Sequence, residues 1–245
     1  MKQLPINTGY TVHEILVPSL GKKLRFRPFL VRENKALMIA QSSENVIEQL
    51  NTLKSIVQAT CVEDQTLDVD KLTTFDFEYL LIMLRSISID KNITLKVTCD
   101  NDEAHEGMED QPRETNVLLD LTTVEVVGLK DYNPKVKLSD DLMVIMKIPT
   151  VEMLDNLPNN NDIEQDLKAV SMQIDKICTT EEVFDASEYT PEQMLDWIEN
   201  LTQQQLNNLL EYFKHIPYCR LRVEWTCPTC GKKNIQYIEG ISYFF

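Results

Sequence analysis

The sequence predicts an α+β fold made of two diverged repeats, each running strand, helices, strand, cysteine turn and strand. Segments in which apolar and polar residues alternate stand between segments with apolar residues at helical spacing. The same order of segments recurs in the two halves, and each half has a Thr-Cys pair ending an expected strand, at Cys99 and Cys227. We therefore expect an N-terminal arm over residues 1–23, a first repeat over residues 24–137 and a second over residues 138–245.

The first repeat opens with a strand over residues 24–30, where apolar and basic residues alternate and Pro28 indicates a sheet edge. Two helices are expected over residues 33–58, with a break at the sequence SSEN. The segment TFDFEYLLIMLRSI has apolar residues at helical spacing and predicts an amphipathic helix. Residues 93–99 alternate as a strand does, and a strand-rich run, TNVLLDLTTVEVV, follows an acidic loop.

The second repeat begins with the strand LMVIMKIPT, which ends at Pro149. The segment DIEQDLKAVSMQIDKIC then predicts one helix, with Val170, Ile174 and Ile177 on its inward face. Two further helices are expected over TPEQMLDWIENL, where Thr190 is the expected cap, and over TQQQLNNLLEYFKHI. The strand CRLRVEWTC completes the order.

A constant offset of 128 residues aligns the two cysteine strands. It places Ile93, Leu95, Val97 and Cys99 on Leu221, Val223, Trp225 and Cys227. Few side chains are identical, so coincidence is the alternative. We favour an internal duplication, because long-period repeats set the architecture of a whole chain.

The sequence TCPTCG contains two cysteines two residues apart, Cys227 and Cys230. In a redox motif the first cysteine begins a helix, whereas Cys227 ends an expected strand and is followed by a turn and a return strand. Gly231 can supply the positive φ that such a turn requires beneath a metal. We therefore favour half of a tetrahedral zinc site, with a redox pair and a plain turn as alternatives. The two hairpins would then join in a zinc-ribbon-like C-terminal sheet.

A structural zinc site needs four ligands, and the repeat indicates where the other two lie. Cys99 occupies the place of Cys227, and His105 follows six residues later. We predict a Cys₃His site made of Cys99, His105, Cys227 and Cys230, with Asp102 or Glu103 as replacements for His105. The alternative is a decayed first turn and an empty site. The other cysteines, at positions 61, 178 and 219, are expected to be small buried hydrophobes.

Composition disfavours several functional classes. With 39 acidic and 24 basic residues the net charge is −15, which disfavours nucleic acid or an anionic membrane as the main partner. We expect no membrane span, since no apolar run approaches roughly 18 residues, and no secretory leader. Six cysteines are too few for a disulfide scaffold and fit a reducing cytoplasm. No phosphate loop, G-x-S-x-G or H-E-x-x-H motif occurs, so we expect neither an enzyme nor a small-molecule substrate.

Basic residues are concentrated in the stretch KKLRFRPFLVRENK. Arg25, Arg27 and Arg32 stand beside Phe26 and Phe29, and interfaces favour this mixture of cations and aromatic rings. We predict that these five residues bind an acidic protein partner. The alternatives are a solvated strand face and, disfavoured by net charge, a DNA contact.

Several strings also carry a resemblance to a known family: KLRFRPFLVRENKALMIA, DVDKLTTFDFEYLLIMLRSISI, ITLKVTC, KVKLSDDLMVIMKIPT and CPTCGKKNIQYIEGISYFF. They resemble the baseplate hub subunit and hub assembly protein family of T-even-type contractile-tailed bacteriophages, from about residue 22 to residue 245. In this family the first turn tends to carry a fuller set of cysteines and histidines, of which only Cys99 and His105 remain here.

The resemblance implies a viral protein without catalysis that builds or assembles the tail baseplate through contacts with other baseplate proteins. It would act in the host cytoplasm during assembly, and it could leave the baseplate or stay in the virion tail. Two other functions are compatible with the residues. One is a zinc-ribbon adaptor that binds nucleic acid or another protein complex, and the other is a CxxC redox protein.

Overall fold

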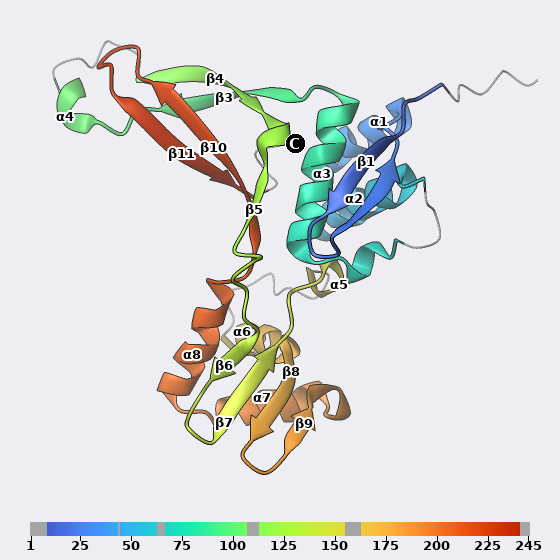
Figure 1. The fold of residues 1–245 in the computed structure, drawn as a ribbon, viewed down its shortest axis with the longest axis vertical. Coiled ribbons are helices and arrows are strands. Elements are labelled where there is room, and N and C mark those ends of the chain that lie inside the picture. Colours follow the sequence, from blue (N-terminus) through green and yellow to red (C-terminus); the bar gives the residue numbers. More distant parts are fainter. Residues whose placement is uncertain (1–8, 44, 63–66, 107–112, 155–162, 241–245) are drawn as a thin grey trace, which may run out of the picture. The chain divides into compact units, whose positions relative to one another are not determined.

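The computed structural model describes residues 9–43, 45–62, 67–106, 113–154 and 163–240 (Figure 1). The chain divides into two compact units. The first comprises Met1–Val69, Phe75–Val126 and Cys219–Phe245, and the second comprises Asp70–Thr74 and Val127–Tyr218. Most of the second unit is therefore an insertion in the sequence of the first. These bounds differ from the sequence-based division after residue 137, and the repeats themselves stay a prediction.

The first unit contains three small antiparallel sheets. Most of its helices precede the cysteine hairpins in the sequence. Its sheets have the orders β1-β2, β3-β4 and β11-β10-β5. The elements are β1 (His13–Val17), β2 (Lys22–Phe26), α1 (Val31–Gln41), α2 (Val46–Thr60), α3 (Thr74–Ser88), β3 (Asn92–Thr98), α4 (Asp102–His105), β4 (Glu114–Asp120), β5 (Glu125–Val127), β10 (Tyr218–Thr226) and β11 (Lys233–Glu239). Single 3₁₀ turns lie at Val69–Lys71 and Leu121–Thr123.

The α+β class is confirmed, but the two cysteine hairpins do not share a sheet. The sequence predicts that they join in one C-terminal sheet. In the described part of the chain, β3 and β4 form a sheet of their own, because the neighbour of β10 opposite β11 is β5. The 3₁₀ turn at Leu121–Thr123, where Asp120 accepts the N–H of Thr122 at 2.9 Å, separates β4 from β5.

Helix α3 forms much of the core of the first unit. Its side chains are apolar on most sides, and Phe75, Phe77, Leu80, Leu81 and Leu84 are all buried. A helix that is apolar nearly all round must be covered on most sides. The sequence predicts this helix. In the structure its side chains are buried on more sides than those of an amphipathic surface helix.

The structure places a strand in the second half of the expected N-terminal arm, whose bounds stay a prediction. His13–Val17 forms β1 and pairs with β2, so that Ile15 lies opposite Leu24. Ile15 and Val17 are buried. The turn between the strands uses Gly21, whose φ of 60° suits glycine, and its N–H donates to the carbonyl oxygen of Val17 at 3.0 Å. The strand is only five residues long, which is too short for a clear sequence signal.

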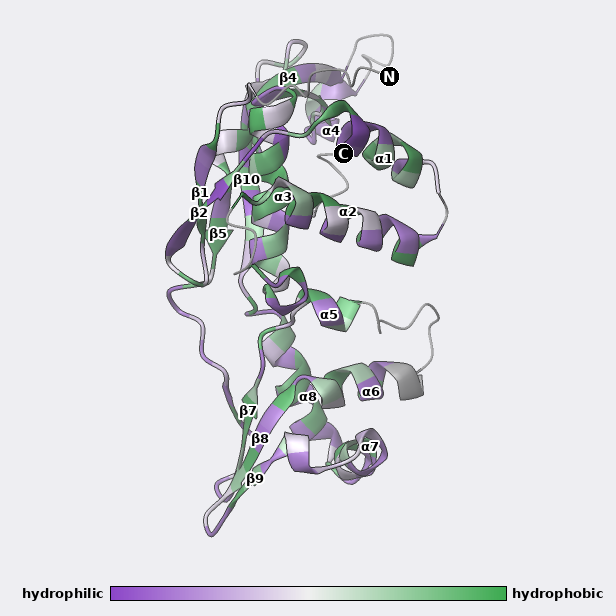
Figure 2. Ribbon diagram, turned by 90° about the vertical axis from the view of Figure 1, so that its right-hand side faces the viewer, coloured by the Kyte–Doolittle hydropathy of each residue, from purple (hydrophilic) through white to green (hydrophobic). Residues whose placement is uncertain are grey.

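The second unit is a four-stranded antiparallel sheet with helices on one face. The strand order is β6-β7-β8-β9, and Figure 2 shows α6, α7 and α8 on the same side of the sheet. The elements are β6 (Lys135–Lys137), β7 (Leu142–Met146), α5 (Val151–Leu154), α6 (Ile163–Met172), β8 (Ile174–Thr179), β9 (Val183–Asp185), a 3₁₀ turn (Ala186–Glu188), α7 (Pro191–Glu199) and α8 (Gln203–Phe213).

The single helix expected from DIEQDLKAVSMQIDKIC is wrong in its second half. Helix α6 ends at Met172, and Ile174–Thr179 forms β8. In its pairing with β7, Lys176 lies opposite Ile145 and Ile174 lies opposite Met146, so Asp175 is an extra residue in a β-bulge. The bulge turns Ile174 and Ile177 to the same face at a spacing of three. This spacing imitates a helical period and explains the wrong prediction.

Candidate metal centre

In two β-hairpins of the first unit, a cysteine directly follows the first strand. Cys99 follows β3 and Cys227 follows β10. Each cysteine closes its hairpin in the same way: the N–H of Cys99 donates to the carbonyl oxygen of Arg113 at 3.0 Å, and that of Cys227 to the carbonyl oxygen of Lys232 at 2.9 Å. This local likeness agrees with the 128-residue offset. It does not test a duplication, which stays a prediction.

The turn after β10 positions both of its sulfurs. Gly231 has a φ of 72°, as the sequence predicts, and its N–H donates to the carbonyl oxygen of Cys227 at 3.0 Å. The tight turn directs backbone N–H groups at the Cys227 sulfur. Hydrogen bonds from the N–H groups of Cys230 and then Thr229 stabilise the thiolate and lower the pKa of Cys227 to about 6. A thiolate is the form that binds a metal.

His105 reaches the same point from the loop of the other hairpin. It ends the short helix α4, whose first turn is capped by the Asn101 side chain, which accepts the N–H of Ala104 at 3.4 Å. His105 is only 2% exposed, and its Nε2 lies 3.6 Å from the Cys227 Sγ. Its Nδ1 is buried without a partner among the described residues. A proton on Nδ1 leaves the Nε2 lone pair facing the sulfurs.

The four predicted ligands form one cluster. Ligand atoms of Cys99, His105, Cys227 and Cys230 all lie within 4.8 Å of one another. The Sγ atoms of Cys99 and Cys230 are 3.8 Å apart, far beyond a disulfide bond. In a tetrahedral zinc site two sulfurs stand about 3.8 Å apart, and a sulfur and a nitrogen about 3.6 Å. Both measured distances therefore have the values that a Cys₃His zinc site requires.

The acidic alternatives to His105 do not join the cluster. Asp102 is exposed and forms an ion pair with Arg113, from Nη1 to Oδ1, at 2.8 Å. Glu103 is exposed as well. His105, by contrast, is buried with the sulfurs because α4 turns its last residue inward. Of the three candidates, only His105 belongs to the group of potential ligands.

Two residues that the sequence did not indicate connect the hairpins around the cluster. Asn234 is buried, and its Nδ2 donates to the Cys99 Sγ at 3.7 Å and to the carbonyl oxygen of Lys232 at 3.1 Å. Lys232 also forms an ion pair with Asp100 at 2.7 Å. Groups that donate to ligating atoms orient them. The polar side chain of Asn234 is itself a signal. It lies opposite Trp225, on the inward face of β11, where an apolar residue is expected.

The remaining cysteines lie outside the cluster. Cys61 and Cys219 are buried, and Cys178 is half-buried. The Sγ of Cys219 donates to the carbonyl oxygen of Phe75 at 3.3 Å, and burial raises the pKa of this thiol. These properties agree with small hydrophobic side chains rather than with ligands.

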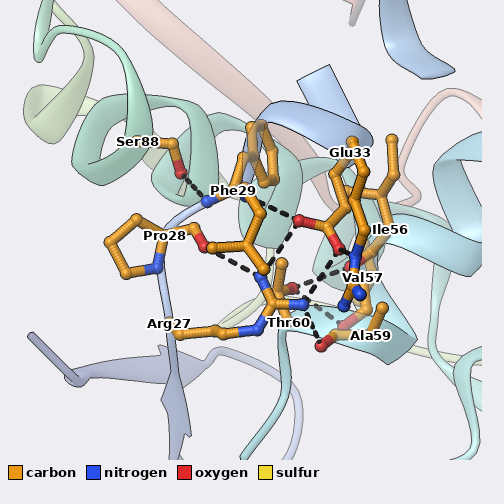
Figure 3. Close-up of polar contacts among 11 residues, drawn as sticks. Arg27, Pro28, Phe29, Glu33, Ile56, Val57, Ala59, Thr60 and Ser88 are labelled. Atoms are coloured by element: carbon orange, nitrogen blue, oxygen red, sulfur yellow. Dashed lines mark hydrogen bonds and ion pairs between the residues drawn. The ribbon is translucent and has the colours of Figure 1, made fainter. Parts of the chain in front are cut away.

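The predicted partner-binding residues do not form one exposed surface. Phe26 is fully buried, and Arg27 is 6% exposed. Figure 3 shows the reason for Arg27: its guanidinium donates to Glu33 at 3.0 and 3.1 Å and to the carbonyl oxygen of Ala59 at 2.8 Å. Neither side chain is therefore exposed, and a role of these two residues in partner binding stays a prediction. Alternation along β2 turns Phe26 to the core, whereas Arg27 follows the strand and is held inward by Glu33 and Ala59.

Of the other three residues in that set, Arg25 and Arg32 are exposed and Phe29 is half-buried. The Nε of Arg32 contacts Glu33 Oε1 at 2.8 Å. The N–H of Phe29 donates to Ser88 Oγ at 2.9 Å (Figure 3). The exposed part of the predicted surface is thus limited to the two outer arginines and part of one ring.

Comparison with known proteins identifies one family for the chain. Residues 10–245 match the family described as T4 bacteriophage base plate protein. A search of curated proteins found no match, and a search of solved structures found none either. In the described part of the chain, no helix is both long and apolar enough to cross a membrane. Since the match covers nearly every residue, the chain belongs to the T4 bacteriophage base plate protein family.

Proposed function

We propose that this protein is a non-enzymatic component of the phage tail baseplate hub, either a structural subunit or an assembly factor, that acts through contacts with other baseplate proteins. The observation that carries the proposal is the family match over residues 10–245. The protein would be present in the host cytoplasm during assembly, and as a subunit it would remain in the virion tail. The net charge of −15 supports protein contacts over nucleic acid.

The composition of purified particles tests this function. Mass spectrometry of mature baseplates and of assembly intermediates should detect the chain in both if it is a subunit, and only in intermediates if it is an assembly factor. Interruption of its gene should prevent complete baseplates from forming in infected cells. Normal baseplates without the gene product would contradict both versions.

We further propose that Cys99, His105, Cys227 and Cys230 bind one structural Zn²⁺. Three sulfurs and one imidazole nitrogen at tetrahedral spacing support it, as does the sheltered position of the cluster. Bound zinc would connect the four side chains rigidly. Backbone N–H groups stabilise the thiolate of Cys227, and the Asn234 amide donates to the Cys99 sulfur.

The metal would join two hairpins whose cysteines are far apart in the sequence. Cys99 and Cys230 are separated by 131 residues, yet both belong to the first unit. The contacts between the hairpins outside the ligands include an exposed ion pair, Lys232 with Asp100, which contributes little because water screens it. Structural zinc binding contributes about 10 kcal/mol in small peptides, so it would dominate this link.

Metal content is the direct test of the site. The purified full chain should contain one zinc per chain by elemental mass spectrometry. Cys227→Ser and His105→Ala should lower the content well below one, because each removes a ligand. Cys178→Ser, which changes a thiol outside the cluster, is the matched control and should retain the metal. A metal-free wild-type chain with a Cys227–Cys230 disulfide would instead favour the redox alternative.

A further inference from the structure

The second unit contains a pocket that the metal centre does not involve. It lies between α7 and the strands β7, β8 and β9, and its volume is about 440 Å³. All of its lining residues belong to the second unit. Ile177 and Met194 contribute apolar side chains from the edge of the core. The pocket is therefore an opening at the end of the core.

Three aromatic rings line this pocket. Phe184 comes from β9, Tyr189 from the residue before the helix cap, and Trp197 from α7. Tyr189 is 38% exposed, and Phe184 and Trp197 are half-buried against the core. Aromatic side chains at the edge of an apolar hollow are typical anchor points of protein interfaces.

The polar groups of the pocket are acidic or amide groups. Asp196 lines it together with the amides of Gln193 and Asn200. Asn200 donates its side-chain N–H to the carbonyl oxygen of Asp196 at 2.7 Å, which fixes this amide at the rim. Asp196 is exposed, and no Lys or Arg of the described residues forms an ion pair with its carboxylate. Among the residues that the structure describes, the lining includes no basic side chain.

The chain around the pocket is strongly acidic. Residues 179–200 contain seven Asp and Glu residues and no Lys, Arg or His. Lysines lie near two of these acids: Lys176 and Lys147 near Asp185, and Lys168 near Glu192. The other five acids, at positions 181, 182, 188, 196 and 199, are exposed. The rim therefore attracts cations, while the interior favours apolar groups.

We propose that this acid-rimmed pocket binds an arginine side chain presented by a basic segment of a partner protein. The aliphatic stem of arginine fits against Met194 and Ile177, and its planar guanidinium stacks on an aromatic face such as that of Trp197. The guanidinium then donates to the Asp196 carboxylate and to the amide oxygen of Asn200. An apolar side chain would instead remove water from the Asp196 carboxylate without offering it a hydrogen bond or a positive charge.

Arginine is preferred to lysine because of its shape. A lysine ammonium is compact and strongly hydrated, whereas the guanidinium is flat, weakly hydrated and able to stack and donate at the same time. The inference relies on the proposed function only in taking the partner to be a protein. The site itself requires neither the baseplate nor the metal.

Capped peptides test the proposal on the ¹⁵N-labelled full chain. The probes are acetyl-Gly-Leu-X-Leu-Gly-amide with arginine, lysine or citrulline, the neutral isostere of arginine, at X. The readout is the indole N–H signal of Trp197, and Trp225 in the first unit is the internal reference. The arginine peptide should produce a saturable shift of the Trp197 signal alone. The citrulline peptide should bind about tenfold more weakly and the lysine peptide several-fold more weakly.

Two variants separate a local contact from general attraction. Asp196→Asn should weaken binding of the arginine peptide about tenfold. Glu199→Gln, which removes an exposed acid on the same helix but outside the pocket lining, should change it less than twofold. Equal effects of the two substitutions would overturn the proposal, as would equal binding of the arginine and citrulline or lysine peptides, or the absence of any Trp197 shift. None of these results would alter the particle-composition test of the baseplate function.

Discussion

At the residue scale, the ion pair between Arg27 and Glu33 shows how two charged side chains can belong to the core. Both side chains are 7% exposed, and the carboxylate also accepts the N–H of Leu30 at the start of α1. Burial alone would raise the pKa of Glu33, but hydrogen bonds from Arg27, Arg32 and Leu30 outweigh it and lower the pKa to about 2. The pair therefore connects β2, α1 and the end of α2.

Removing the charge of Glu33 should destabilise the first unit. Glu33→Gln keeps the size of the side chain but leaves Arg27 buried beside a neutral group, so we expect the free energy of unfolding to fall by about 3 kcal/mol. Urea denaturation followed by circular dichroism measures this change. Glu48→Gln, an exposed acid on α2 that accepts from Ser43 Oγ, is the control and should cost less than about 0.5 kcal/mol.

The same pair predicts a pH dependence with a definite sign. The folded-state pKa of Glu33 is about 2 and its ordinary value is 4.5. Its stabilisation is therefore complete above pH 4.5 and is lost as the pH falls from about 4.5 towards 2. The difference in unfolding free energy between wild type and Glu33→Gln should be constant from pH 5 to 7 and shrink below pH 4.5. A difference that grows with acid would contradict this assignment.

At the element scale, caps and turns fix where the helices and hairpins begin and end. Helices α7 and α8 each begin with a complete capping box, formed by Thr190 with Gln193 and by Thr202 with Gln205. The first box also sets the start of the helix that supplies Trp197 and Asp196 to the acid-rimmed pocket. The boundaries of α7 were therefore readable from the sequence.

Loss of the α7 cap should cost a small, measurable amount of stability. Thr190→Ala removes the hydroxyl that accepts the N–H of Gln193 at 3.3 Å, and we expect a loss of about 1 kcal/mol. Thr190→Ser retains an accepting oxygen and should lose only a few tenths of that amount. Thermal or urea unfolding compares the two variants, and equal losses would show that the hydroxyl does not cap the helix.

The sequence predicts elements well where local signals agree and fails where tertiary pairing decides. Helices α1, α2, α3, α7 and α8 and strands β3, β10 and β11 follow from periodicity and caps. Strand β8 does not, because the bulge at Asp175 gives its inward isoleucines a helical spacing. The ligand group was predictable because cysteine spacing is chemically specific. The burial of Phe26 and Arg27 was not, because it depends on contacts with the end of α2, which is distant in the sequence.

At the scale of the whole molecule, two units with separate cores share one chain. The four candidate ligands all lie in the first unit, whereas the acid-rimmed pocket lies in the second. The chain therefore keeps its candidate metal centre and its candidate arginine site in different units. Each can be perturbed while the other serves as a control.

Metal removal should therefore act on one unit only. A zinc chelator should increase hydrogen exchange of backbone amides in β3, β4, β10 and β11, because it removes the link between the two hairpins. Amides in β7 and β8 should keep their protection, since the second unit contains none of the ligands. Hydrogen-exchange mass spectrometry resolves these segments, and a uniform increase along the chain would contradict the assignment of the site.

The separation of the ligands along the chain also sets an order for biosynthesis. His105 and Cys227 lie 122 residues apart, and nearly all of the second unit is translated between them. Domains generally fold as units while the ribosome moves from the N-terminus to the C-terminus. Until the inserted unit has been translated, the Cys99 thiol and the His105 imidazole therefore lack the two cysteines that would complete the candidate site. Strands β10 and β11, which are translated after the inserted unit, complete the unit to which β3 and β4 belong.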